Sequence, residues 1–112
     1  MAGSFELKKA KDGQFHFNLL AGNGQIILSS EMYKARKSAE NGIASVQKNS
    51  GDEARYKRLS SKNGKFYFTL LAANSQVIGQ SQMYATEASR DAGIESCKAN
   101  GSSDTIKDLT AG

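Results

Sequence analysis

Three cations lie close together in the first half of the chain, at Lys34, Arg36 and Lys37. They fall at the start of a predicted helix, where the helix dipole makes cations mildly unfavourable. The matched positions in the second half carry no cations and are Ala85, Glu87 and Ala88. Backbone N–H groups and basic side chains at such a helix start can converge on one phosphate group. We therefore treat the cluster as a candidate contact for an anion or nucleic acid; the alternative is solvated side chains whose charges are screened.

A second candidate surface is the strand face that bears His16 and, at the matched position, Tyr67. We expect this face to be open in a two-layer fold, and it should also carry Asn18, Leu20, Thr69 and Leu71. Aromatic rings near lysines resemble the platforms on which single-stranded nucleic acids stack, and the nearby lysines are Lys57, Lys62 and Lys65. The two leucines would equally suit contact with a protein. Exposure to solvent without a function is the third alternative.

Catalysis is poorly supported, because the chain has one cysteine, Cys97, and one histidine, His16. Covalent catalysis needs a nucleophile and a base within hydrogen-bond reach. Cys97 matches Val46 on the apolar side of a predicted helix, which predicts a buried, unreactive thiol. One histidine and one cysteine in separate halves fall short of a zinc site, and no glycine-rich phosphate loop with its lysine is present. We predict that the protein is not an enzyme and has no catalytic residue, cofactor or metal.

The elements that position these residues occur twice. Residues 5–50 align with residues 56–101 at a constant offset of 51 without a gap, and 18 of the 46 aligned positions are identical. A unit of about 50 residues buries too small a fraction of its surface to be stable alone, so the two copies should share one core. We predict a single domain over residues 1–112, built of two repeats at about 4–54 and 55–110.

The identical positions are mostly Phe, Leu, Gly and turn residues. In contrast, His16, Cys97 and the cluster at residues 34–37 do not recur in the other copy. This difference suggests that the repeats preserve a scaffold, and it directs the search for a function to positions where the copies disagree.

Each repeat begins with three predicted strands. Asp12-Gly13 and Asn63-Gly64 predict tight hairpin turns. The alternation that follows predicts strands over residues 15–20 and 66–71, with the phenylalanines toward the core. A third strand is predicted at residues 25–30 and 76–81, which completes a three-stranded meander.

A helix should follow the strands in each repeat. Its apolar stripe is predicted at Ala35, Ala39, Ile43 and Val46 in the first copy and at Ala88, Ala92, Ile94 and Cys97 in the second. Gly42 and Gly93 lie inside these helices, where glycine costs about 1 kcal/mol relative to alanine. We infer that each glycine permits a close approach of helix to sheet or of helix to helix. Thr86 is suited to cap the second helix, whereas Ala35 cannot cap the first.

Two more short strands are predicted, around Tyr56-x-x-Leu59 and Ile106-x-x-Leu109. The spacing of three between large apolar residues breaks strict alternation, so we expect a bulge or bend there. The segment at Tyr56 closes the first unit and opens the second. The predicted fold is α+β, with one continuous, mostly antiparallel sheet and both helices on one face.

The sequence pattern also resembles a known family, the YegP-like proteins of bacteria. The resemblance rests on Gly-x-Phe-x-Phe-x-Leu, Ala-x-Asn-x-Gln, Met-Tyr and Ser-x-x-x-Gly-Ile-x-Ser in both copies, and on Ile-Lys-Asp-Leu-Thr at residues 106–110. It covers nearly the whole chain and implies tandem β-β-β-α-β units that merge into one sheet and exchange their C-terminal strands. The family has no established biochemical activity, so the resemblance adds almost nothing about function. Single-copy relatives are expected to form dimers, so we expect this two-copy chain to be a monomer.

Composition limits the function further. The formal net charge is +4, with 38% hydrophobic and 23% charged residues, which is typical of a globular protein. No apolar run approaches the roughly 20 residues that span a bilayer, and residues 1–11 do not read as a secretory signal. We expect a cytoplasmic, non-enzymatic binding or interaction module with an unidentified protein partner. The alternative is weak nucleic-acid or polyanion binding through the basic helix start and the open sheet face.

Overall fold

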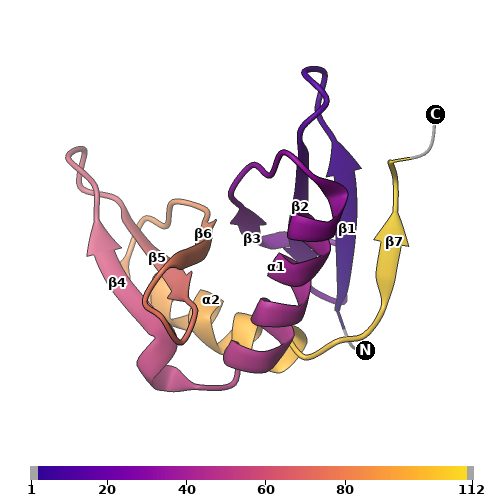
Figure 1. Cartoon of the computed structure of the whole chain (residues 1–112). Helices are drawn as coiled ribbons and strands as arrows, with labels where there is room; N and C mark the ends of the chain where they lie inside the picture. The colour runs from indigo at the N-terminus through magenta and orange to yellow at the C-terminus, as the bar shows by residue number, and fades with distance from the viewer. Residues whose placement is uncertain (1–2, 111–112) are drawn as a thin grey trace.

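The computed structural model describes residues 3–110 and contains seven strands and two α-helices (Figure 1). The first repeat forms β1 (Ser4–Lys9), β2 (Phe15–Leu20), β3 (Ile26–Ser30) and α1 (Arg36–Asn49). The short 3-10 helix η1 (Glu53–Arg55) leads into the second repeat, which forms β4 (Tyr56–Ser60), β5 (Phe66–Leu71), β6 (Val77–Ser81) and α2 (Glu87–Asn100). The last strand is β7 (Ile106–Asp108).

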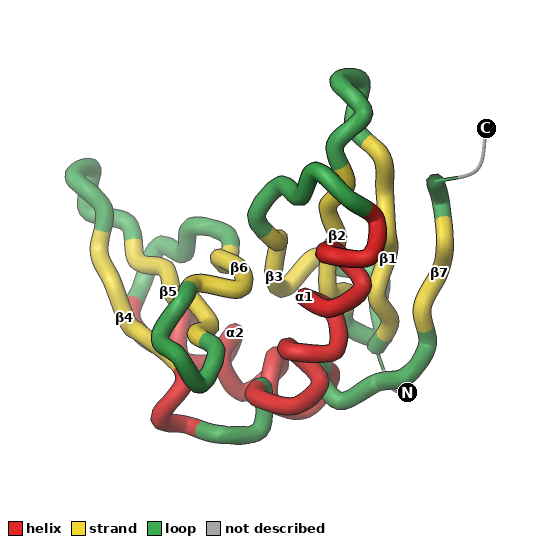
Figure 2. The backbone as a smooth tube through the Cα atoms, viewed as in Figure 1, coloured by secondary structure: helices red, strands yellow, loops and turns green. Residues whose placement is uncertain are grey.

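All seven strands form one sheet in the order β4-β5-β6-β3-β2-β1-β7. Every neighbouring pair is antiparallel except β7 and β1, which are parallel with Phe5 opposite Ile106. The strand that follows the second repeat therefore completes the sheet of the first, at its outer edge (Figure 2). The predicted α+β fold, with a merged sheet and an exchanged C-terminal strand, is confirmed.

The two repeats are related by a pseudo-twofold axis at the centre of the sheet. In the β3–β6 ladder Ser29 lies opposite Gln80, and these two residues also occupy matched positions of the repeats. The axis therefore passes between them. The turns of the β1–β2 and β4–β5 hairpins project on either side as two arms (Figure 1).

Side chains near this axis fit because one repeat supplies a glycine where the other supplies a larger residue. A Cβ atom on Gly79 would lie 2.9 Å from Cγ of Leu28, its matched residue. Gly101 likewise lies against the buried side chain of its matched residue Ser50. Two large side chains cannot occupy the same place on an axis, so the repeats differ there for steric reasons.

The helices bury one stripe each against the core. In α1 the stripe contains Ala39, Ile43 and Val46, as predicted, although Ala35 is exposed. In α2 the prediction is wrong for Ala88 and Ala92, which are exposed. Neither α-helix within residues 3–110 is long and apolar enough to cross a membrane.

Arg90 takes the place in α2 that Ala39 has in α1. Its guanidinium group lies 5.6 Å from the centre of the Phe66 ring, and Nε is 3.2 Å from Asp91. An arginine stem and a cation over an aromatic ring can replace an apolar contact. The burial of Arg90 could not be predicted from the spacing of apolar residues, because its side chain is charged.

The predicted helix start of α2 is confirmed, because Thr86 Oγ1 accepts a hydrogen bond from the Ser89 N–H at 3.1 Å. Ala35 makes no such bond. The predicted irregularity at Tyr56 and Leu59 is wrong, since β4 pairs with β5 in continuous register. Bulges occur instead at Leu19/Leu20 and Leu70/Leu71, where β2 and β5 meet the third strand of each repeat.

The sheet face opposite the phenylalanines is less open than predicted. Asn18 and Thr69 are each only 6% exposed, and Leu20 is 8% exposed. Their neighbours across the strands are polar, with Asn18 between Glu6 and Ser29, and Thr69 between Lys57 and Gln80. A row of polar side chains therefore crosses this face.

Two equivalent clefts as candidate binding sites

Arg36, from the predicted basic cluster, is engaged in a structural contact. Its guanidinium group forms ion pairs with Asp108 and, at 3.2 Å, with Glu40, and Nη1 donates to Thr110 Oγ1 at 3.0 Å. These contacts join the start of α1 to β7. Arg36 thus helps to fix the exchanged strand, which accounts for a cation at an unfavourable helix position.

The five predicted contact residues do not form one site. Lys34 and Lys37 are exposed at the start of α1, where Arg36 is already paired. His16 and Tyr67 are half-buried on the opposite face of the sheet, in the two separate strands β2 and β5. The sheet therefore separates the basic cluster from the predicted aromatic surface.

The β7 contact predicts an unusual titration. Hydrogen bonds from the Thr110 hydroxyl and backbone N–H, followed by Arg36, lower the pKa of Asp108 to about 2. Because the folded-state pKa is depressed, ionised Asp108 stabilises the contact above the carboxyl's ordinary range, and this contribution is lost as pH falls toward 2. A ¹³C NMR titration of Asp108 should show this low midpoint. Thr110→Val should raise it more than Arg36→Gln; the reverse order would contradict the assignment.

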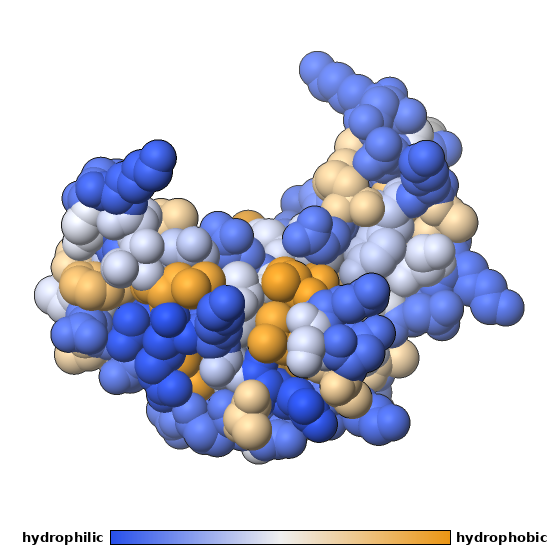
Figure 3. Space-filling model, turned by 60° about the vertical axis from the view of Figure 1, so that its left-hand side comes forward, coloured by the Kyte–Doolittle hydropathy of each residue, from blue (hydrophilic) through white to orange (hydrophobic). Residues whose placement is uncertain are grey.

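Two clefts lie between the repeats. Each is bounded by the helix of one repeat and by the hairpin that joins the second and third strands of the other, β2–β3 or β5–β6. Cleft A, about 640 Å³, lies between α2 and the segment that joins β2 to β3, with Gln82 and Tyr84 at its side. Cleft B, about 320 Å³, lies between α1 and the segment that joins β5 to β6, with Glu31 and Tyr33 at its side. Figure 3 shows hydrophobic residues at the surface between two hydrophilic projections. Val77, which lines cleft B, is exposed.

The two clefts occupy equivalent places about the pseudo-twofold axis, although cleft A, at about 640 Å³, is larger than cleft B, at about 320 Å³. Each of the eleven residues that line cleft B matches a lining residue of cleft A at the offset of 51. Eight of these eleven pairs are identical, compared with 18 of 46 over the whole alignment. The identical pairs are Ala21/Ala72, Asn23/Asn74, Gln25/Gln76, Ile27/Ile78, Tyr33/Tyr84, Ser38/Ser89, Gly42/Gly93 and Ser45/Ser96. Identity between the repeats is therefore concentrated in the clefts.

A tyrosine forms one side of each cleft. Tyr33 exchanges two backbone hydrogen bonds of 2.7 Å with Phe15, which fixes its place beside β2. Its ring stacks on Phe17, and a Cβ atom on Gly42 would lie 2.7 Å from its hydroxyl oxygen. Gly93 has the same relation to Tyr84. A close approach at the helix glycines was predicted, but between backbones; the groups that approach Gly42 and Gly93 are tyrosine and phenylalanine side chains.

Both tyrosine hydroxyls are available to a ligand. Within residues 3–110 neither hydroxyl makes a hydrogen bond that would occupy it. Burial raises the pKa of Tyr33, with a further contribution from Glu31, and burial together with Cys97 raises that of Tyr84. The hydroxyls therefore stay protonated at neutral pH and can both donate and accept hydrogen bonds.

Some of the shared polar residues have structural roles instead. Asn23 and Asn74 accept hydrogen bonds of 3.1 Å from the N–H groups of Gln25 and Gln76, which shape the turns. Ser45 and Ser96 receive side-chain hydrogen bonds from Asn49 and Asn100. The amides of Gln25 and Gln76 have no such role among the described residues and are exposed. The glutamines and tyrosines are thus the strongest candidates for ligand contacts.

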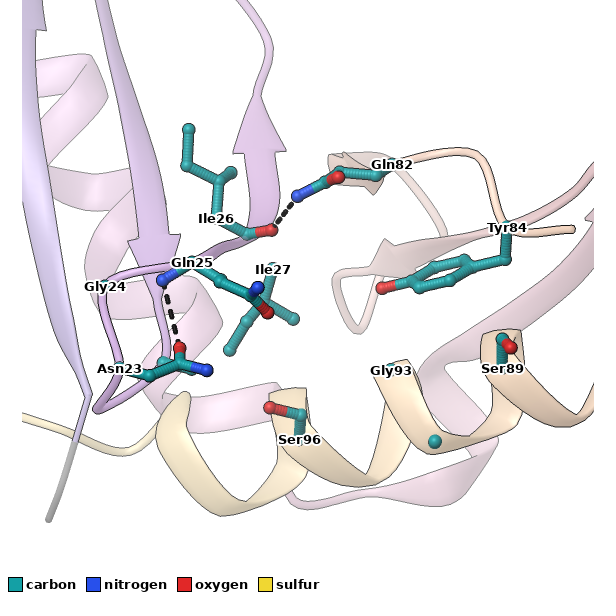
Figure 4. A pocket seen from close by; sticks show the side chains of 12 residues that line it. Asn23, Gly24, Gln25, Ile26, Ile27, Gln82, Tyr84, Ser89, Gly93 and Ser96 are labelled. Atoms are coloured by element: carbon teal, nitrogen blue, oxygen red, sulfur yellow. Dashed lines mark hydrogen bonds between the residues drawn. The ribbon is translucent and has the colours of Figure 1, made fainter.

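The clefts open where the central ladder of the sheet ends. Only three residues of β3 pair with β6, so Ile26 and Ile27 lie beyond the ladder, as do Val77 and Ile78. In cleft A the side chain of Gln82 donates a hydrogen bond to the Ile26 carbonyl (Figure 4). In the same view the Tyr84 hydroxyl and the Gln25 amide point toward the space between β3 and α2.

The reactive groups are not gathered in a comparable way. Cys97 is fully buried, as predicted, and burial raises the pKa of its thiol to about 11. Within residues 3–110, no three His, Cys, Asp or Glu side chains are grouped so that they could hold a metal ion. Apart from Glu31 in cleft B, the clefts offer neutral hydrogen-bonding groups beside aliphatic walls, which suits reversible binding.

The sequence pattern did not reveal the clefts because each combines residues far apart in the chain. Gln25 and Ser96, for example, line cleft A from different repeats. A signal was nevertheless present. Gln25 and Gln76 are identical polar residues that neither the core nor a turn requires. Tyr33 and Tyr84 are also identical, and their rings pack against the core but their hydroxyls are not needed there.

Comparisons of this chain with family profiles, curated proteins and solved structures all match the same family. The profile described as "Domain of unknown function (DUF1508)" matches the chain twice, at residues 10–56 and 61–108. The UPF0339 protein of Acinetobacter baylyi is 67% identical over 98% of this chain and 99% of its own length. The UPF0339 protein YegP of Escherichia coli is 61% identical over 98% of this chain and 100% of its own length.

Two solution NMR structures share the fold. One is of YegP from E. coli, described as a protein of unknown function, with a TM-score of 0.95 and 60% identity, covering 100% of this chain and 97% of that one. The other is of a UPF0339 protein from Shewanella oneidensis, with a TM-score of 0.93 and 55% identity, covering 98% of this chain and 93% of that one.

Proposed function

For this chain, which belongs to the YegP family and carries the DUF1508 domain twice, we propose a non-enzymatic function. The chain binds extended segments of a partner protein. The segments bind in clefts A and B. The observation that carries this proposal is the near-identity of the two clefts, with eight identical pairs out of eleven. Turn geometry and helix packing account for only part of that identity.

The chemistry of the clefts supports a peptide as ligand. Peptide groups need both donors and acceptors, and a neutral tyrosine hydroxyl and a glutamine amide each supply both. The backbone beyond the β3–β6 ladder lines the same space. Aliphatic residues such as Ile27 and Ile78 provide an apolar wall for one side chain of the segment. Few charges are involved, so binding should depend only weakly on salt.

The proposal is tested by NMR titration of the ¹⁵N-labelled protein. The ligands are capped tripeptides, Ac-Gly-X-Gly-NH₂, in which X is each of the twenty side chains. We expect at least one tripeptide to shift the signals of Tyr33 and Gln76 in cleft B together with those of Tyr84 and Gln25 in cleft A. If no tripeptide shifts either cleft, peptide binding there is wrong.

A parallel titration examines the rival function, polyanion binding. Single-stranded DNA and RNA are added at low and moderate salt, because phosphate contacts weaken steeply as salt rises. Salt-sensitive shifts at Lys34, Lys37 and Tyr67, with the clefts unaffected, would favour the rival. Shifts in the clefts with peptides and none with nucleic acid would support the peptide proposal.

A further inference from the structure

The two clefts differ in charge at one matched position. Cleft A has Gln82 where cleft B has Glu31. The only other marked chemical difference among the eleven pairs is Asn41 of cleft B in place of Ala92. Cleft B therefore has more oxygen acceptors than cleft A, and one of them carries a negative charge at neutral pH.

Gln82 shows what kind of group fits at this position. Its Nε2 donates a hydrogen bond to the carbonyl of Ile26, just beyond the β3–β6 ladder (Figure 4). An N–H donor from the opposite repeat thus extends the hydrogen bonding of the ladder by one more group. The side chain of Gln82 acts as an internal model for a ligand donor.

In cleft B this donor is missing. The matched carbonyl belongs to Val77, and the matched side chain, Glu31, can only accept hydrogen bonds when ionised. Within residues 3–110 no side chain donates to the Val77 carbonyl, and no cation lies within ion-pair distance of Glu31. Cleft B consequently has an unpaired carboxylate, Glu31, close enough to Tyr33 to add to the rise in its pKa that burial causes. Val77, whose carbonyl accepts no side-chain hydrogen bond, lines the same cleft.

We propose that cleft B selects a basic side chain of the bound segment, a lysine ammonium or an arginine guanidinium group. Its N–H groups take the place at Val77 that the Gln82 amide takes at Ile26, and its charge pairs with Glu31. Cleft A, where the donor is already supplied and no charge is present, has no such preference. This assignment rests on the proposed function, since it concerns which segment the clefts accept.

The test uses the reciprocal variants Glu31→Gln and Gln82→Glu, which exchange the charge between the clefts. Ac-Gly-Lys-Gly-NH₂ is compared with the tripeptide in which norleucine, its uncharged counterpart, replaces lysine. In the wild type we expect the lysine peptide to bind cleft B more tightly than the norleucine peptide, by up to about fivefold, which is the upper end for an exposed ion pair. Glu31→Gln should abolish this preference, and Gln82→Glu should create one in cleft A.

The outcomes separate the two proposals. Equal binding of the lysine and norleucine peptides to cleft B, or a lysine preference that survives Glu31→Gln, would overturn the charge selection while leaving peptide binding intact. A lysine preference that follows the carboxylate from one cleft to the other would support it. Both substitutions are at exposed positions. Glu31→Gln should melt like the wild type, whereas Gln82→Glu loses the hydrogen bond to the Ile26 carbonyl and should melt at a slightly lower temperature.

Discussion

Replacing Gly79 by leucine should destabilise the protein by about 2–4 kcal/mol, because a second large side chain would enter the space that Leu28 fills near the pseudo-twofold axis. A Cβ atom on Gly79 would already lie 2.9 Å from both Leu28 Cγ and the Ser29 carbonyl oxygen. Leu28→Gly should cost about 3–5 kcal/mol, since it removes a fully buried side chain and leaves a cavity.

The double variant Leu28→Gly/Gly79→Leu tests whether the axis is the reason. It moves the large side chain to the other repeat, so it should lose at least 1 kcal/mol less than the sum of the single variants. Urea denaturation followed by far-UV circular dichroism measures all four proteins. Strict additivity would mean that Leu28 and Gly79 do not compete for one space, and the steric explanation of this difference between the repeats would be wrong.

Replacing Gly93 by valine should destabilise the protein by about 1–3 kcal/mol, although valine is a better helix former than glycine. A Cβ atom on Gly93 would lie 2.8 Å from Cζ of Tyr84 and 3.2 Å from Cε2 of Phe68, so a branched side chain must displace the tyrosine ring. Gly42→Val should have a similar effect through Tyr33 and Phe17, because atoms of both rings would lie within 3.1 Å of a Cβ atom on Gly42.

Matched controls are available on the exposed sides of the same helices. Ala44→Val in α1 and Ala99→Val in α2 should change the free energy of unfolding by about 0.5 kcal/mol or less. In a Tyr84→Ala background, Gly93→Val should lose most of its effect because the obstructing ring is gone. An equal loss in both backgrounds would show that the glycine is needed for a reason other than the tyrosine.

The local elements could be predicted because their signals lie within a few residues of one another. Asp12-Gly13 and Asn63-Gly64 indicated the hairpins, and the helix glycines indicated a close approach. The prediction of the buried stripe of α2 was wrong because Arg90 is buried against the Phe66 ring, and this contact depends on tertiary structure. The bulges at Leu19/Leu20 and Leu70/Leu71 are likewise set by pairing between strands.

The candidate site could not be assembled from sequence, because each cleft takes its residues from both repeats. The sequence interpretation directed attention to unmatched residues such as Arg36, which in the structure fixes β7. The identical polar pairs were classified as scaffold. That classification holds for Asn23 and Asn74, which shape turns. It leaves Gln25, Gln76 and the tyrosine hydroxyls without a structural explanation.

The central claim is that the chain binds through two equivalent clefts, and the most direct test is the stoichiometry of the tripeptide titration. Tyr33→Phe/Gln76→Ala removes the available groups of cleft B, and Tyr84→Phe/Gln25→Ala removes those of cleft A. For the tripeptide that shifts both clefts, NMR should report two sites in the wild type, one in each double variant and none in the quadruple variant. Two sites that survive in the quadruple variant, or shifts confined to the hairpin arms and the start of α1, would contradict the claim.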